Sequence, residues 1–204
     1  MDINVKNVDL AYDQCENLHK TMDMRGSVLM SELKSNITNL KVHWISSDAS
    51  AHINNLIDLH TFLGNVIVDS VNSISYAADR IISIQNVRKA NHGGSGNVGT
   101  HLSTRTDFDK LSHIENTAEY QVSYGELTSD LNDLKSIQAS YMQLISTFKN
   151  QRDELFNNWL AGANIERARQ VFNDFLDNSD KYKNYLDSAI ENLSKATSNI
   201  SFIS

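Results

Sequence analysis

Mainly apolar residues recur at steps of three or four along most of the first 90 residues. The first series consists of Val8, Tyr12, Cys15, His19, Met22, Gly26, Leu29, Leu33, Ile37, Leu40 and Trp44. The second series runs from about Ala49 to Val87 and consists of Ile53, Leu56, Ile57, His60, Leu63, Ile67, Val71, Ile74, Ala78 and Ile81. This spacing places each series on one face of a helix, and at 1.5 Å per residue each helix is on the order of 55 Å long. Because such narrow stripes are not buried by one helix alone, each helix must pack lengthwise against others.

The second half of the chain repeats this arrangement. One stripe consists of Leu127, Leu131, Leu134, Gln138, Tyr141, Leu144, Phe148, Arg152, Leu155 and Trp159, and the next of Ala168, Val171, Phe172, Phe175, Tyr182, Leu186, Ala189, Leu193, Ala196 and Ile200. When Trp159 is aligned with Trp44, Leu155 falls on Leu40. The repeat predicts an all-α fold: tandem helix-turn-helix hairpins that form an antiparallel four-helix bundle or an elongated coiled-coil-like pair. The tryptophans are expected at the helix reversals, partly buried.

Three parts are expected along the chain. Residues 1–90 form the first hairpin with its turn near Trp44, residues 91–105 form a Gly-rich linker, and residues 106–204 form the second hairpin with its turn near Trp159. The linker contains the run NHGGSGNVGT, whose composition is typical of a flexible connection. Residues 106–124 also show helical spacing, through Phe108, Leu111, Ile114 and Ala118. This spacing predicts that the third helix begins well before residue 124.

Small and polar residues follow both tryptophans. Ile45, Ser46, Ser47 and Asp48 follow Trp44, and Leu160, Ala161, Gly162, Ala163 and Asn164 follow Trp159. The side chains of Ser47 or Asp48, and of Asn164, are candidates to cap the next helix. Small side chains allow the large indole ring to lie against the turn. The predicted turn motif is therefore Trp44 with Ser46, and Trp159 with Ala161 and Gly162.

The helix, tryptophan turn and second helix resemble the WXG family of small helical hairpins, which are exported by type VII (ESX-like) secretion systems. The resemblance covers about residues 22–87 and 127–200, as two units in tandem. The family's glycine position holds Ser46 in the first unit and Ala161 in the second. Family members also carry a tyrosine followed four residues later by an acidic residue, beyond the last helix, and neither Tyr182 nor Tyr185 has this spacing. The resemblance therefore implies a protein that is exported, or one that serves the export of a partner.

Charge and hydropathy exclude several classes of protein. The net charge is −7, and no basic face indicates a nucleic-acid binder. No apolar stretch is long enough for stable membrane insertion, and residues 1–10 lack the apolar core of a secretory signal. We expect a protein that is secreted by a signal-peptide-independent route, or is cytoplasmic before export.

No pattern of reactive or ligating residues indicates a catalytic or metal site. His52 and His60 lie without the Glu-x-x-His motif of helical di-metal bundles, and neither a nucleophile elbow nor a phosphate-binding glycine loop occurs. Four acidic residues fit a solvated helix face: Asp130, Asp133, Asp153 and Glu154. The single cysteine, Cys15, falls on an apolar stripe and is interpreted as a small buried hydrophobe. The sequence predicts no enzyme, no cofactor and no metal.

Two function classes remain. The first is a type VII secretion-associated protein, either a secreted substrate or an adaptor for a helical partner, and its apolar stripes are candidate partner-binding surfaces. The partner would be a second copy of the chain or the helical N-terminal region of a larger type VII substrate or toxin, with Leu33, Leu40, Phe148 and Leu155 as candidate contacts. The second class is a structural or assembly bundle of a phage or cell envelope, without a role in secretion. Whether the hairpins pack on each other or on another chain stays open at this stage.

Overall fold

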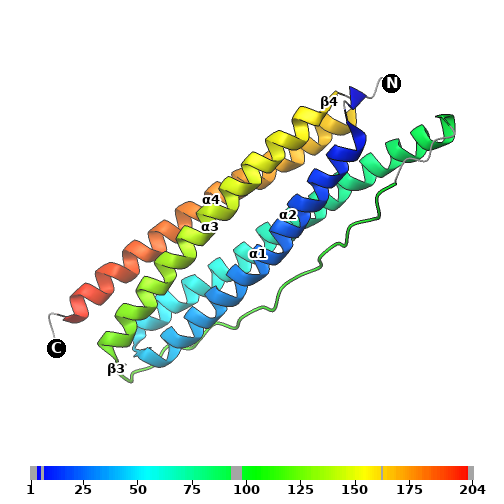
Figure 1. Ribbon diagram of the computed structural model, residues 1–204. Helices are drawn as coiled ribbons and strands as arrows, with labels where there is room; N and C mark the ends of the chain where they lie inside the picture. Colours follow the sequence, from blue (N-terminus) through cyan, green and yellow to red (C-terminus); the bar gives the residue numbers. More distant parts are fainter. Residues whose placement is uncertain (1–3, 6, 93–97, 162, 202–204) are drawn as a thin grey trace. The chain divides into compact units, whose positions relative to one another are not determined.

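The computed structural model describes residues 4–5, 7–92, 98–161 and 163–201. Within these residues, four helices pack against one another as an all-α bundle (Figure 1): α1 (Val8–His43), α2 (Ser47–His92), α3 (Tyr124–Asn158) and α4 (Ala163–Ser201). Short strands flank the helices: β1 (Asn4–Val5), β2 (Trp44–Ile45), β3 (Gln121–Val122) and β4 (Trp159–Ala161). The predicted all-α class is confirmed.

The helix faces follow the sequence periodicity closely. Every residue named in the first two apolar stripes is buried, including the polar His19 and His60. Val87, where the second stripe was expected to end, is exposed. The third stripe is buried except at Gln138 and Arg152, its two polar positions. Burial of apolar area at about 25 cal/mol per Å² is the main stabilising contribution to such a fold.

The chain forms two compact units, and each unit draws on both predicted hairpins. Unit 1 comprises Met1–Gly26, Val66–Thr106 and Leu144–Asn178, and unit 2 comprises Ser27–Asn65, Asp107–Gln143 and Ser179–Ser204. Each helix therefore contributes one segment to each unit, and each unit buries the apolar faces of four helical segments.

Aromatic rings fill the core of each unit. In unit 1, the ring centroid of Phe148 lies 4.4 Å from that of Phe175 and 5.6 Å from that of Phe172. In unit 2, Tyr141 and Tyr182 meet edge to face with their centroids 4.7 Å apart. Such geometries are favourable for aromatic pairs beyond the area that they bury.

The helical start predicted within residues 106–124 is wrong. Residues 98–120, which we call the strap, have no helix or strand, and α3 begins only at Tyr124. In Figure 1 the strap is the green trace that follows α1 and α2. The steps of three between Phe108, Leu111 and Ile114 are compatible with an α-helix. They also match an extended chain with three residues per turn.

Candidate functional site

The first tryptophan turn closes α1 onto α2 within three residues. Trp44 and Ile45 form β2, which pairs antiparallel with β3, and the next residue caps α2. The Ser46 hydroxyl accepts a hydrogen bond from the backbone N–H of Ala49 at 3.0 Å. The capping residue is thus Ser46 rather than Ser47 or Asp48 as predicted, because the chain turns one or two residues earlier than expected and α2 begins at Ser47.

The second tryptophan turn is built in the same way. Trp159 and Ala161 lie in β4, which pairs antiparallel with β1, Val5 opposite Trp159 and Asn4 opposite Ala161. Gly162, predicted as part of this motif, lies outside the described residues, as do the side chains of Ala161 and of the predicted cap Asn164.

Both indole rings are more deeply buried than expected. Only 3% of Trp44 and none of Trp159 is exposed, so the expectation of partly buried rings is wrong. The Trp44 ring stacks on His52, with the ring centroids 5.4 Å apart. The Trp159 Nε1 is buried and has no hydrogen-bond acceptor among the described residues. Both rings therefore contribute to the core of a unit and present almost no surface to solvent.

The paired strands link the two hairpins reciprocally. The tryptophan strand of the first hairpin, β2, pairs with the strand that precedes the second hairpin, and the tryptophan strand of the second hairpin, β4, pairs with the strand that precedes the first. Sequence reasoning missed β1 and β3. Both consist of an amide residue followed by valine, Asn4–Val5 and Gln121–Val122, so a repeat search extended to the start of each hairpin offers a signal for them.

A polar cluster lies beside the first turn in unit 2. His43 Nδ1 lies 2.7 Å from Asp130 Oδ2, and the Asn36 amide donates a hydrogen bond of 2.7 Å to the backbone carbonyl of Asp130. Asp130 is only 2% exposed, so its assignment to a solvated helix face is wrong. The turn-end histidine covers the carboxylate, and the pair joins α1 to α3. Hydrogen-bonded burial of this kind specifies which helices meet.

A cavity of about 470 Å³ opens beside the same turn. It is lined by the turn itself, by the first turns of α2, by Tyr120 of the strap and by the last turns of α4, including His52 and Lys195. Burial lowers the pKa of His52, and the nearby Asp48 opposes this shift. The cavity thus combines aromatic side chains with one lysine and one carboxylate, Lys195 and Asp48.

The four candidate partner-binding residues are in the core. Leu33 and Leu40 on α1, and Phe148 and Leu155 on α3, have no exposed surface. Another protein can reach them only if the helices separate. In this conformation the stripes are covered by the chain's own helices, so any partner meets the outer faces.

Three further properties bear on function. The described residues contain no group of three or more histidine, cysteine or carboxylate side chains arranged to hold a metal ion. None of the helices, as far as the structure describes them, is long and apolar enough to cross a membrane. Burial raises the pKa of the Cys15 thiol to about 12, so this cysteine is not poised as a nucleophile.

Comparison with known proteins adds no relative: no protein-family model, no curated protein and no solved structure matches this chain.

Proposed function

We propose that this chain is a type VII secretion-associated helical protein, either exported itself or acting as an adaptor for a helical partner. The observation that supports the proposal best is the doubled unit of strand, helix, tryptophan strand and helix, whose strands pair reciprocally. In the WXG family, which the sequence resembles, two separate hairpins usually associate as a dimer. Here two hairpins are joined in one chain, and each covers the apolar stripe of the other.

Burial of the stripes limits how a partner binds. Because the core positions are occupied within the chain, an adaptor of this kind must bind its partner through exposed side chains. In unit 2, large apolar side chains remain exposed at Tyr120 (65%), Tyr185 (59%) and Val42 (62%). Single exposed apolar residues are common on soluble proteins, so only a partner-binding experiment assigns a role to them.

The experiment is an export assay of the full chain in a bacterium with an active type VII system. The tagged chain is expressed with and without the secretion ATPase, and both the medium and the proteins that co-purify with the chain are measured. We expect the chain in the medium, or a bound exported helical protein, and ATPase-dependent export in either case. Retention in cells of both strains, with no exported protein bound, would instead support a structural or assembly bundle.

A pair of substitutions separates recognition from folding. Trp44→Phe keeps an aromatic ring in the core. Tyr120→Ser changes an exposed side chain that lines the same cavity as Trp44. If the partner binds beside this cavity, Tyr120→Ser lowers partner recovery without changing the helical circular dichroism signal. Trp44→Phe serves as the matched control for stability. It should lower partner recovery only to the extent that it unfolds the chain.

A further inference from the structure

The strap is bound along α1 and α2 with a period of three residues. In each successive triplet one residue is less exposed than its neighbours: Leu102, Arg105, Phe108, Leu111, Ile114 and Thr117. Three residues per turn is the repeat of the polyproline II helix, which makes no internal hydrogen bonds. The main-chain groups of the strap therefore need partners from outside the strap.

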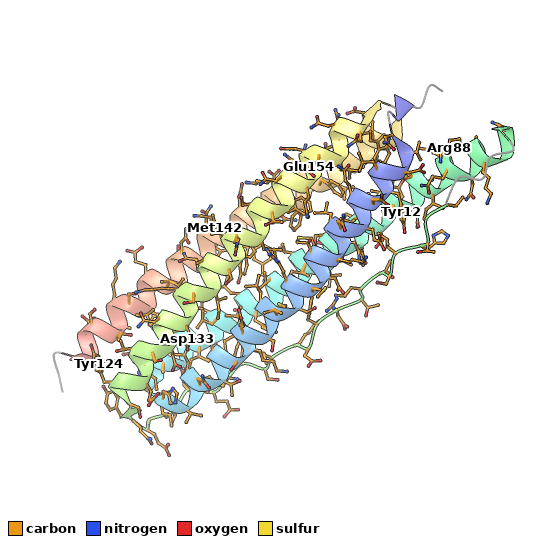
Figure 2. All side chains as sticks on the ribbon, in the orientation of Figure 1. Tyr12, Arg88, Tyr124, Asp133, Met142 and Glu154 are labelled. Carbon is orange, nitrogen blue, oxygen red and sulfur yellow. The ribbon has the colours of Figure 1, made fainter. Side chains whose placement is uncertain are left out.

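In unit 1, helix side chains bind the main chain of the strap. Asn72 accepts a hydrogen bond from the N–H of Arg105 at 2.8 Å and donates one to its carbonyl at 2.9 Å. The Tyr12 hydroxyl, labelled in Figure 2, accepts from the N–H of Thr100 at 3.0 Å and donates to its carbonyl at 2.8 Å. Each side chain thus satisfies both polar groups of one strap residue, as a neighbouring β-strand would.

Two more strap residues in unit 1 are held by their main chain. Ser75 donates to the Ser103 carbonyl at 2.9 Å, and His19 Nε2 lies 2.7 Å from the same oxygen. The N–H of Gly99 donates to the Gln85 side chain at 2.9 Å. Recognition of this segment therefore depends on groups that any polypeptide carries.

Unit 2 repeats this mode of recognition. Asn54 accepts from the N–H of Ile114 at 2.8 Å and donates to its carbonyl at 3.0 Å. Ser50 donates to the Glu115 carbonyl at 3.2 Å. In both units an asparagine side chain thus makes two hydrogen bonds to the main chain of one strap residue.

Side-chain contacts add to the main-chain hydrogen bonds. Aspartates of α1 and α2 pair with basic or imidazole side chains of the strap: Asp23 with Arg105 at 2.8 Å, Asp79 with His101 at 2.6 Å and Asp58 with His113 at 2.8 Å. The strap's Asp109 makes the reverse pairing, with Lys34 at 3.2 Å. The helices thus offer three carboxylates and one lysine as partners for polar side chains of the strap.

We propose that, in each unit, this surface of α1 and α2 is a receptor for an extended polypeptide segment, and that the strap is its built-in occupant. A partner protein's extended segment, with mostly apolar side chains at every third position as in the strap, displaces the strap and takes over its main-chain hydrogen bonds. Because the strap is tethered, it competes at an effective concentration of about millimolar. The wild-type chain therefore binds such a segment weakly until the strap is loosened. This inference does not depend on a role in export.

The test is binding of a fluorescent peptide with the sequence of residues 98–120 to the full-length chain, followed by anisotropy. The host carries Arg105→Ala and Phe108→Ala, which remove the ion pair with Asp23 and the aromatic ring that lies beside Gly64. We expect saturable one-to-one binding, at least ten times tighter than to the wild-type chain. Absence of saturable binding to this variant, with its helical signal intact, would overturn the proposal.

A matched control tests whether the peptide binds to this surface of α1 and α2. Adding Asn54→Ala and Asn72→Ala to the loosened host should weaken peptide binding at least tenfold while the helical signal stays unchanged. Equal binding with and without the asparagines would also overturn the proposal, because the peptide would then bind elsewhere.

A second measurement uses the wild-type chain, so it does not depend on the variants folding. If the strap opens locally, the amides of Gly99, Arg105 and Ile114 exchange with solvent at least ten times faster than amides in the centre of α2. Equal exchange rates would show that the strap leaves only when the whole protein unfolds, and the strap would then be a fixed part of the fold.

Discussion

Substitution of Gly26 by alanine tests how closely α1 and α2 approach in unit 1. A Cβ atom at Gly26 would lie 2.7 Å from Cγ2 of Ile67, and 3.1 and 3.2 Å from its Cδ1 and Cγ1. Ile67 is β-branched and only 1% exposed, so its side chain has few alternative rotamers. The helices must therefore shift apart to admit a methyl group.

Two opposing effects set the size of the change. Alanine is favoured over glycine in a helix interior by about 1 kcal/mol, whereas inserting a methyl group into a packed core costs about 1–3 kcal/mol. Gly125 in α3 offers a matched control, since a Cβ there meets no atom within 4 Å. We expect Gly125→Ala to stabilise the chain slightly and Gly26→Ala to be less favourable than this control by about 1–3 kcal/mol.

The assay is urea unfolding followed by circular dichroism, together with a double-mutant cycle. In an Ile67→Ala background the space beside residue 26 is open, so Gly26→Ala should become favourable and the two substitutions should couple by more than about 0.5 kcal/mol. If Gly26→Ala stabilises the wild-type chain as much as Gly125→Ala does, the helices do not meet at Gly26 and the reasoning is refuted.

Three further predictions concern the core and its titrating groups. Leu40→Ala and Leu155→Ala, both at fully buried positions, should each lower the free energy of unfolding by about 2–5 kcal/mol, whereas Val42→Ala at an exposed position should change it by less than about 0.5 kcal/mol; wild-type-like melting of both leucine variants would show that the helix faces are assigned wrongly. Cys15, with its pKa raised to about 12 by burial, should resist iodoacetamide at pH 8 until denaturant unfolds the chain, and rapid labelling of the folded chain would contradict its burial. Burial lowers the pKa of His60 below 6.5, so on acidification the unfolded chain takes up a proton at a higher pH than the folded chain does. The stability that this group contributes above pH 6.5 is therefore lost as the pH falls through the lowered pKa. His60→Gln should make the free energy of unfolding, measured by urea at each pH, depend less on pH between pH 7 and pH 5, and an unchanged pH dependence would show that other groups cause it.

Local periodicity determined most of the secondary structure. Steps of three and four keep apolar side chains on one helix face, and this property depends only on the geometry of the α-helix. The burial of the first two stripes, from Val8 to Ile81, was therefore accessible from the sequence. The positions of both reversals were accessible for the same reason, since the stripes end at Trp44 and Trp159.

Short-range sequence patterns did not predict the backbone conformation where two conformations share the same residue spacing. The steps of three at Phe108, Leu111 and Ile114 suit a helix and an extended chain alike, and only the surrounding helices decide between them. Asn54 and Asn72 supply the hydrogen bonds that stabilise the extended form. Their amide groups show no local signal, because their partners lie far away in the sequence.

The sequence by itself determined four amphipathic helices and the two tryptophan turns, because each depends on residues that are neighbours along the chain. Tertiary structure alone decided which strands pair across the hairpins, that Asp130 is buried under His43, and that the strap lies extended on α1 and α2. These features join residues distant in sequence, and their stability comes from main-chain hydrogen bonds and desolvation that exist only once the helices have packed.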